Sequence, residues 1–468
     1  MDRGYPAGNC NPGNTETAMK PRVTILGAGE SGTGAALLAK AQGYDVFVSD
    51  RGVIADKYKA ELKAAGVPFE EGTHSLDRIL DCSLMVKSPG IPPSAPAVAA
   101  AEKAGIEIID EIEFAFRYTK SNIIAITGTN GKTTTTLLTY HLLREAGFNV
   151  ALAGNVGVSF ARQVASGSHD WYVLEVSSFQ LDGTTSFNPL VGVLLNITPD
   201  HLDRYSSMAE YTDSKFRLIQ NMDADRYFIY VADDPIIAEE INRRVIRPRQ
   251  IRISLRSETE SYYDGKEMNF TIGGDLRIKQ SDTTLVGPHN LINTMAAVSA
   301  ARLAGVTPDD IRKALLTFRN APHRLEPVGT INGVTFINDS KATNVDSVAY
   351  ALSSYSGPLV WIAGGIDKGN DYGQIKDEVR KKVKALICLG KDNEKLRRAF
   401  RDVVAIIRET QEMRELVRMA LAEAEAGDVV LLSPACASFD LFRNYEDRGD
   451  QFRQAVKELA EEQQTNKV

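Results

Sequence analysis

The segment Gly128-Thr-Asn-Gly-Lys-Thr133 combines residue types that suit phosphate binding. It follows the apolar stretch 123–126 and precedes a segment with helical spacing. In such a turn, successive backbone N–H groups can cradle phosphate oxygens, Lys132 can neutralise β- and γ-phosphate charge, and the Thr133 hydroxyl can reach Mg²⁺. Only two residues separate the two glycines, so the loop is shorter than the standard P-loop pattern. It predicts binding of a nucleoside triphosphate.

A second glycine-rich turn, Gly27-Ala-Gly-Glu-Ser-Gly32, lies near the start of the chain. It follows the apolar stretch 22–26 and precedes a predicted helix over 34–42, so a helix N-terminus can face a diphosphate. Asp50 ends the next predicted strand, about 20 residues further on, where a carboxylate can meet a ribose hydroxyl. The pattern predicts a nucleotide site without deciding which nucleotide binds.

Helices and strands must position these loops, and the length and composition of the chain indicate what kind of protein contains them. The chain has 468 residues, which suggests about three domains at roughly 150 residues each. Apolar residues make up 43% and charged residues 25%, as in ordinary globular proteins. The formal charge of −7 provides no overall positive field, so we expect neither nucleic acid nor an anionic membrane as a partner.

Cysteine spacing and hydropathy indicate the compartment. The four cysteines, at positions 10, 82, 388 and 436, lie far apart without a Cys-x-x-Cys pair, which suits a reducing cytosol. No apolar run approaches the roughly 18 residues that a membrane helix needs, so no membrane insertion is expected. Residues 1–20 are rich in Gly, Asn, Pro and Thr, and we interpret them as a loose N-terminal extension. We therefore expect a cytoplasmic protein, and we also expect it to be a monomer.

Apolar strands alternate with helical segments along the rest of the chain, which predicts an α/β fold with largely parallel sheets. We predict three domains: residues 21–119, Rossmann-like; residues 120–321, a P-loop-type ATPase domain; and residues 322–468, Rossmann-like. Short alternating segments between residues 251 and 286 predict a small antiparallel addition to the second domain. In the third domain the predicted strands cover 334–337, 359–363, 385–389, 403–407 and 429–432.

Taken together, these and further motifs resemble the Mur ligases, the ATP-dependent amino-acid-adding enzymes of peptidoglycan synthesis. The motifs that carry the resemblance are Gly128-Thr-Asn-Gly-Lys-Thr133, Gly154-Asn155, Glu175-Val-Ser-Ser-Phe-Gln180, Asn196-Ile-Thr-Pro-Asp-His-Leu-Asp203, Ser214-Lys215, Gly287-Pro-His-Asn-Leu-Ile-Asn293, Pro322-His-Arg324, Asn338-Asp-Ser-Lys-Ala-Thr-Asn344, Gly364-Gly-Ile-Asp-Lys368 and Ser433-Pro-Ala-Cys-Ala-Ser-Phe-Asp440. The last three resemble the branch that adds D-glutamate to UDP-N-acetylmuramoyl-L-alanine. The Asp-Asn-Pro-Arg-like stretch of diaminopimelate-adding members does not occur.

The resemblance implies a reaction through an acyl phosphate, with ATP and Mg²⁺ at two sites. The implied catalytic residues are Lys132, His201 and Lys215. The implied metal ligands are Thr133, Glu175, His201 and Lys215, the last as a carbamate. The implied ATP contacts are Thr129, Asn130, Gly131, Lys132, Thr133, Thr134, Thr135, Asn290, Asn293, Arg324 and Asp339, with Lys341 as a further charge beside the phosphates.

It also implies where the two other substrates bind. The implied contacts of the UDP substrate are Gly29, Glu30, Ser31, Asp50, Ser88, Pro89, Gly90, Asn155, Ser177 and Gln180. The implied D-glutamate contacts are Thr343, Lys368, Ser438, Phe439 and Tyr445. The family's Asp-Thr-Arg order is not reproduced at Asp50-Arg-Gly52, so the uridine contact of Arg51 stays open.

Two other functions compete with this one. An NAD-dependent dehydrogenase is supported by Gly27–Gly32 with Asp50, but it leaves the second phosphate loop unexplained. A nucleotide-dependent switch is supported by the P-loop alone, and it predicts ATP hydrolysis that is indifferent to D-glutamate.

Overall fold

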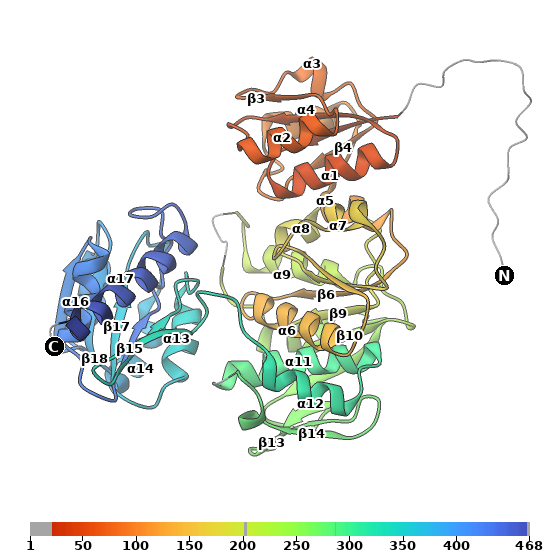
Figure 1. The fold of residues 1–468 in the computed structure, drawn as a ribbon. Coiled ribbons are helices and arrows are strands. Elements are labelled where there is room, and N and C mark those ends of the chain that lie inside the picture. Colours follow the sequence, from red (N-terminus) through yellow and green to blue (C-terminus); the bar gives the residue numbers. More distant parts are fainter. Residues whose placement is uncertain (1–20, 201–203, 286, 466–468) are drawn as a thin grey trace, which may run out of the picture. The chain divides into compact units, whose positions relative to one another are not determined.

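A computed structural model describes residues 21–200, 204–285 and 287–465 (Figure 1). The chain forms two compact units. The first runs to Tyr118 and also includes Ser159–Ser166, and the second comprises Thr119–Val158 and the chain from Gly167 onward. No helix in the described ranges is long and apolar enough to span a membrane.

The first unit is built on a five-stranded parallel sheet in the order β3-β2-β1-β4-β5. Its strands are β1 (Arg22–Leu26), β2 (Asp45–Asp50), β3 (Phe69–Glu71), β4 (Leu84–Lys87) and β5 (Glu107–Asp110). Its helices are α1 (Glu30–Ala41), α2 (Asp56–Ala64), α3 (Leu76–Ile79), α4 (Pro96–Lys103), α5 (Glu111–Phe116) and α7 (Phe160–Ser166). The apolar residues of β1 and β2 are buried, as expected for strands covered by helices on both faces.

The second unit contains a nine-stranded sheet in the order β14-β13-β12-β11-β10-β9-β6-β8-β7. Its strands are β6 (Asn122–Thr127), β7 (Val150–Gly154), β8 (Trp171–Glu175), β9 (Val191–Leu194), β10 (Tyr227–Val231), β11 (Arg249–Ser254), β12 (Ser261–Tyr263), β13 (Glu267–Phe270) and β14 (Leu276–Lys279). Its helical segments are α6 (Lys132–Glu145), α8 (Ser178–Asp182), α9 (Met208–Phe216), η1 (Arg217–Ile219), α10 (Pro235–Arg243), η2 (Gln280–Asp282), α11 (Pro288–Ala304) and α12 (Pro308–Thr317). The pairs β12–β13 and β13–β14 are antiparallel, which confirms the predicted antiparallel addition.

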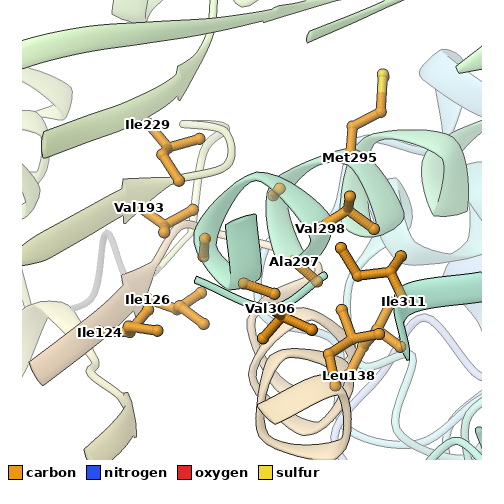
Figure 2. Packing of buried hydrophobic residues seen from close by; sticks show 14 of the residues in the cluster. Ile124, Ile126, Leu138, Val193, Ile229, Met295, Ala297, Val298, Val306 and Ile311 are labelled. Carbon is orange, nitrogen blue, oxygen red and sulfur yellow. The ribbon is translucent and has the colours of Figure 1, made fainter. Parts of the chain in front are cut away.

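A continuous apolar core holds this sheet to helices α6, α11 and α12. Figure 2 shows Ile126, Val193 and Ile229, from three neighbouring strands, with Val298 of α11 and Leu138 of α6 in the same cluster. All five residues are 0% exposed. This packing sets the C-terminal end of β6 and the start of α6 side by side.

The second unit also contains a six-stranded sheet in the order β15-β16-β20-β17-β18-β19. Its strands are β15 (Glu326–Ile331), β16 (Val334–Asn338), β17 (Leu359–Ala363), β18 (Val383–Leu389), β19 (Ile406–Thr410) and β20 (Val429–Leu432). Its helical segments are α13 (Val345–Ser353), η3 (Tyr372–Ile375), α14 (Lys376–Lys382), α15 (Glu394–Phe400), α16 (Met413–Ala422) and α17 (Tyr445–Thr465). β15 is antiparallel to β16, and the other pairs are parallel. The three α/β sheets confirm the predicted fold class.

Candidate active site

The loop between β6 and α6 has the backbone shape of a phosphate cradle. Gly128 and Gly131 adopt positive φ angles of 151° and 85°, which disfavour residues with a Cβ atom. A Cβ atom at Gly131 would lie 2.4 Å from Asn293 Oδ1, so the backbone comes close to α11. Asn196 fixes the loop, because its backbone O accepts from the N–H of Thr129 (3.0 Å) and its Oδ1 accepts from the N–H of Asn130 (2.8 Å). The first amides of α6 therefore meet a rigid turn, as anion binding requires.

Lys132 folds back on this loop. Its Nζ donates to the carbonyl oxygens of Gly128 (2.9 Å) and Thr129 (2.8 Å). Burial lowers the pKa of the ammonium, although the charge of Glu175 opposes the shift. Both partners are neutral carbonyls, so the positive charge is not cancelled and stays available to a phosphate.

The threonines after Lys132 connect the loop to distant segments. Thr133 Oγ1 accepts from Arg324 Nη2 at 2.7 Å, and Thr135 Oγ1 donates to Asn293 Oδ1 at 3.3 Å. Thr134 Oγ1 donates to Asn320 Oδ1 at 3.2 Å. Residues far apart in the sequence thus meet at the phosphate loop.

A cavity next to the loop, which we call the Asn290 cavity, collects most of the residues expected to bind ATP. Asn293 Nδ2 donates to Asn290 Oδ1 at 2.9 Å, so the two amides form one polar edge. Its lining includes Asn130, Gly131, Thr134, His289, Asn290, Asn293, Arg324, Asp339, Lys341 and Tyr350. His289 and Tyr350, which were not predicted as site residues, have rings 5.3 Å apart at an angle of 44°. Burial lowers the pKa of His289 to about 4, so this ring is neutral at pH 7.

Asp339 lines the Asn290 cavity but also holds its walls. Its carboxylate accepts from Ser433 Oγ at 2.9 Å and from the N–H of Leu325 at 3.2 Å. Burial raises the pKa of Asp339 to about 7. Because Leu325 follows Arg324, this carboxylate sets the position of the arginine that contacts Thr133.

A second cavity of about 230 Å³, the Glu175 cavity, shares Arg324 and Lys341 with the Asn290 cavity. Its lining includes Thr133, Asn155, Glu175, His323, Arg324, Lys341 and Tyr445. Glu175, at the end of β8, is 2% exposed, and its Oε1 accepts from Asn155 Nδ2 at 2.6 Å. Its Oε2 has no hydrogen-bond partner among the described residues. A buried, unpaired carboxylate oxygen beside a threonine hydroxyl is a donor set that fits Mg²⁺.

Lys215 lies on α9, and its side chain reaches the phosphate loop at Gly128. It is 1% exposed, its Nζ donates to the Gly128 carbonyl at 2.9 Å, and the ring of Tyr211 lies 4.5 Å away. Burial, reinforced by the charge of Lys132, lowers the pKa of Lys215 well below its usual value. His201 lies outside the described residues.

Thr343 and Lys368, from different strand-end loops, meet at a third cavity, the Lys368 cavity, of about 570 Å³. The expected partners Ser438, Phe439 and Tyr445 are not among its lining residues. Ser438 is buried, the Phe439 side chain is 67% exposed, and Tyr445 borders the Glu175 cavity. The two loops are still joined, because the N–H of Ile366 donates to Ala437 O at 2.8 Å.

In the first unit, the turn after β1 and the end of β2 share one carboxylate. Asp50 Oδ2 accepts from the N–H of Ala28 and Oδ1 accepts from the N–H of Gly52, both at 2.7 Å. A Cβ atom at Gly27 would lie 2.5 Å from Ser88 Oγ, so the Ser88-Pro89-Gly90 loop abuts the turn.

Three other residues expected to touch the UDP substrate have structural partners. The carboxylate of Glu30 accepts from Arg162 Nε at 2.7 Å and from the N–H of Ser159 at 3.0 Å, which holds α7 against α1. Ser177 and Gln180 form a capping box at the start of α8. The turn stays open at Gly29, where an added Cβ atom would meet no other atom within 4 Å.

Comparison with known families shows what this arrangement belongs to. Residues 126–301 match the Mur ligase middle domain, residues 323–436 match the Mur ligase glutamate ligase domain, and residues 22–97 match the MurD N-terminal domain. The chain belongs to the Mur ligase family. Mur ligases use ATP, generally with Mg²⁺, so this Mur ligase is an ATP-dependent ligase. Membership excludes the dehydrogenase and nucleotide-switch alternatives, because one ligase family accounts for all three sheets.

Individual relatives of this Mur ligase match along nearly all of the chain. The UDP-N-acetylmuramoylalanine–D-glutamate ligase of Cytophaga hutchinsonii is 51% identical over 94% of this chain and 100% of its own. The enzyme of the same name from Bacteroides fragilis is 50% identical with the same coverage. Among solved structures, a pseudomurein peptide ligase type C from Methanothermus fervidus has a TM-score of 0.62 at 20% identity, covering 94% of this chain and 100% of its own. The last likeness supports the fold alone.

Proposed function

We propose that this Mur ligase joins D-glutamate to UDP-N-acetylmuramoyl-L-alanine at the expense of ATP, in cytoplasmic synthesis of peptidoglycan precursors. The carrying observation is the match over 94% of the chain to relatives named UDP-N-acetylmuramoylalanine–D-glutamate ligase at 51% and 50% identity. The Lys368 cavity supports it locally, because a lysine and a threonine hydroxyl suit a carboxylate of the incoming amino acid.

The proposed reaction has two steps. A carboxylate oxygen of the UDP substrate attacks the γ-phosphorus of ATP, and ADP leaves. The amine of D-glutamate, after losing a proton, then attacks the acyl carbon, and inorganic phosphate leaves. Neither step requires covalent attachment to the protein, so positioning and charge stabilisation supply most of the rate.

We assign the nucleotide to the phosphate loop and the Asn290 cavity. The amides at the start of α6 and the Lys132 ammonium would hold the phosphates, because both present uncancelled positive charge. The Asn290–Asn293 edge offers amide groups to the base. Thr129–Thr135, Arg324 and Asp339 complete the assigned nucleotide contacts, some directly and some by holding the others in place.

For Mg²⁺ we propose two sites. Glu175 and Thr133 would hold the first ion, and Lys215, as a carbamate, would hold the second together with His201. Bound Mg²⁺ would neutralise charge that develops on phosphate oxygens. The surroundings of Lys215 support a carbamate, since this modification needs a neutral amine and burial favours that form.

We assign the UDP diphosphate to the Gly27–Gly32 turn and the Ser88–Gly90 loop of the first unit. Domain limits at 21–119, 120–321 and 322–468 would separate UDP, ATP and amino-acid binding. Asp50 would act by shaping the turn as well as by any ribose contact, because both its oxygens bind backbone N–H groups. Asn155, Ser177 and Gln180 are assigned to the sugar-peptide portion, and Thr343, Lys368, Ser438 and Phe439 to D-glutamate. The enzyme is proposed to act as a monomer.

A phosphate-release assay with a matrix of substrates tests this function. ATP, Mg²⁺ and UDP-N-acetylmuramoyl-L-alanine are supplied with D-glutamate, L-glutamate, D-alanine or L-lysine. We expect turnover with D-glutamate, and turnover lower by roughly 10⁴-fold in favourable cases for acceptors that leave a buried polar partner unmatched. Equal turnover with L-glutamate or L-lysine would assign this enzyme to another step of the pathway.

A further inference from the structure

Lys341 is shared by the two cavities that contain the proposed nucleotide and metal contacts. It lines the Asn290 cavity with Asn293 and the Glu175 cavity with Asn155. It belongs to the loop after β16, where its backbone N–H donates to His323 O at 3.1 Å. Its side chain therefore borders both the proposed nucleotide contacts and the proposed metal contacts.

An aromatic ring, rather than a carboxylate, is the close partner of this ammonium. Lys341 Nζ lies 3.7 Å from the centroid of the Tyr445 ring. The carboxylates of Glu175 and Glu446 act on its charge, but neither forms an ion pair with it among the described residues. The negative face of an aromatic ring attracts and orients a cation without a net charge of its own. Because no carboxylate is paired with it, the charge of this ammonium remains available to phosphate oxygens.

The ring and the ammonium are held in register by one residue. Ser340, which precedes Lys341, donates from its Oγ to the backbone O of Tyr445 at 2.8 Å. Arg448 Nε donates to the same Oγ at 2.9 Å, which ties α17 to this loop. The His323 ring packs edge-on against Tyr445, with centroids 6.2 Å apart at 81°. The hydrogen bond to its backbone and the packed imidazole ring together give the Tyr445 ring a defined position.

We propose that Tyr445 is a positioning residue, whose ring holds the Lys341 ammonium at the junction of the two cavities during phosphoryl transfer. This inference rests on the proposed function. It gives Tyr445 a different part from the expected contact with D-glutamate, in agreement with its place in the Glu175 cavity and not in the Lys368 cavity. A hydrogen bond from the Tyr445 hydroxyl is the main competing explanation, and the two make opposite predictions for phenylalanine.

The test replaces residue 445 by phenylalanine, by leucine, and by mono-, di- and trifluorophenylalanine. Fluorine withdraws electrons from the ring face while leaving size and apolar character nearly unchanged, so it weakens cation–π attraction selectively. For each variant, kcat and the KM values of ATP and D-glutamate are measured by phosphate release. Tyr445→Leu is also made in a Lys341→Met background, which has no ammonium to position. Titration of each protein with a non-hydrolysable ATP analogue and Mg²⁺ provides a readout that needs no acceptor.

We expect Tyr445→Phe to keep kcat within about twofold and Tyr445→Leu to lower it about tenfold, the range of a partly buried cation–π contact. In the fluorinated series, kcat should fall stepwise with the number of fluorine atoms, while KM for D-glutamate should stay within about twofold. In the Lys341→Met background, Tyr445→Leu should cause no further loss of kcat. A flat fluorine series, or equal losses in the two backgrounds, would overturn the proposal. A rise confined to KM for D-glutamate would return Tyr445 to the amino-acid site. If the parent enzyme shows no D-glutamate-dependent turnover, the proposed function is wrong. The Tyr445 proposal is then decided by the affinity for the ATP analogue, which should fall stepwise across the fluorinated variants.

Discussion

Replacing Arg448 by methionine should destabilise the six-stranded sheet more than any surface change on the same helix. Arg448 is 1% exposed and spans three strand-end loops. Its guanidinium donates to Ser340 Oγ (2.9 Å) and Ser340 O (2.8 Å), to Cys436 O (3.2 Å) and to Gly364 O (3.4 Å). Burial lowers its pKa to about 10, so the group remains charged at pH 7.

The size of the loss follows from these acceptors. An acceptor left buried without a donor costs about 1–3 kcal/mol, and Arg448→Met removes the donor from several at once. Against this, methionine fills part of the volume and relieves the burial of a charge. We therefore expect the free energy of unfolding to fall by about 3–5 kcal/mol, the range for breaking a buried charged network. Arg448→Lys should recover less than half, because one ammonium cannot reach three loops.

Tryptophan fluorescence makes the measurement local. The chain has two tryptophans, Trp171 in β8 and Trp361 in β17. In a Trp171→Phe background, urea unfolding followed by fluorescence reports on Trp361, which is fully buried. Arg453→Met is the matched control, since Arg453 lies on the same helix with a side chain 38% exposed and should lose within about 1 kcal/mol. A loss for Arg448→Met no larger than that of the control would refute the reasoning.

Four further outcomes are expected. Lys132→Ala should lower kcat by on the order of 10²-fold with little change in stability, as measured by phosphate release and thermal unfolding, because an electrostatic stabiliser is lost; near-normal turnover would contradict the phosphate-loop assignment. Lys215→Ala should be largely inactive and partly restored by small carboxylates, and full activity in carbonate-free buffer would remove the carbamate. Lys368→Ala should raise KM for D-glutamate and leave ATP binding near normal in the same assay. Burial raises the pKa of Glu111 to about 8, so its stability contribution is present below pH 4.5 and is lost as pH rises to 8. Between pH 4.5 and pH 7, the free energy of unfolding of Glu111→Gln should therefore rise relative to that of the parent by on the order of 3 kcal/mol, as measured from unfolding curves. A difference that does not change with pH would contradict this.

Local signals in the sequence predict the strand-end loops well. A buried apolar strand followed by glycines and a helix start produces one conformation wherever it occurs, so the loop at Gly128–Thr133 could be placed without tertiary information. The prediction fails where apolar residues end a helix. Val403 and Val404 were part of a predicted strand over 403–407, but their N–H groups both donate to Phe400 O, and β19 begins only at Ile406.

Contacts between distant residues could not be predicted. Arg448 and Ser340 are 108 positions apart, and Arg162 and Glu30 are 132 apart, and no periodicity connects either pair. The edge strand β15 was also missed, because it contains Pro327 and Gly329, which are both rare inside strands. Motifs thus identified residues that the structure brings together at the Asn290 cavity, whereas the network that orders those residues could not be predicted.

Helix α7 sets an order for synthesis of the protein. It belongs to the first unit, where its Ala161 N–H donates to the buried Glu111 and its Arg162 binds Glu30, although residues 119–158 before it belong to the second unit. The first unit thus lacks a helix until Ser166 has been made, about 48 residues after Tyr118. At roughly 5–20 residues per second, synthesis of these residues takes some 2–10 s, and during this time the apolar residues that pack against Phe160 stay exposed to solvent. The ribosome must therefore deliver part of one unit before the other can finish folding.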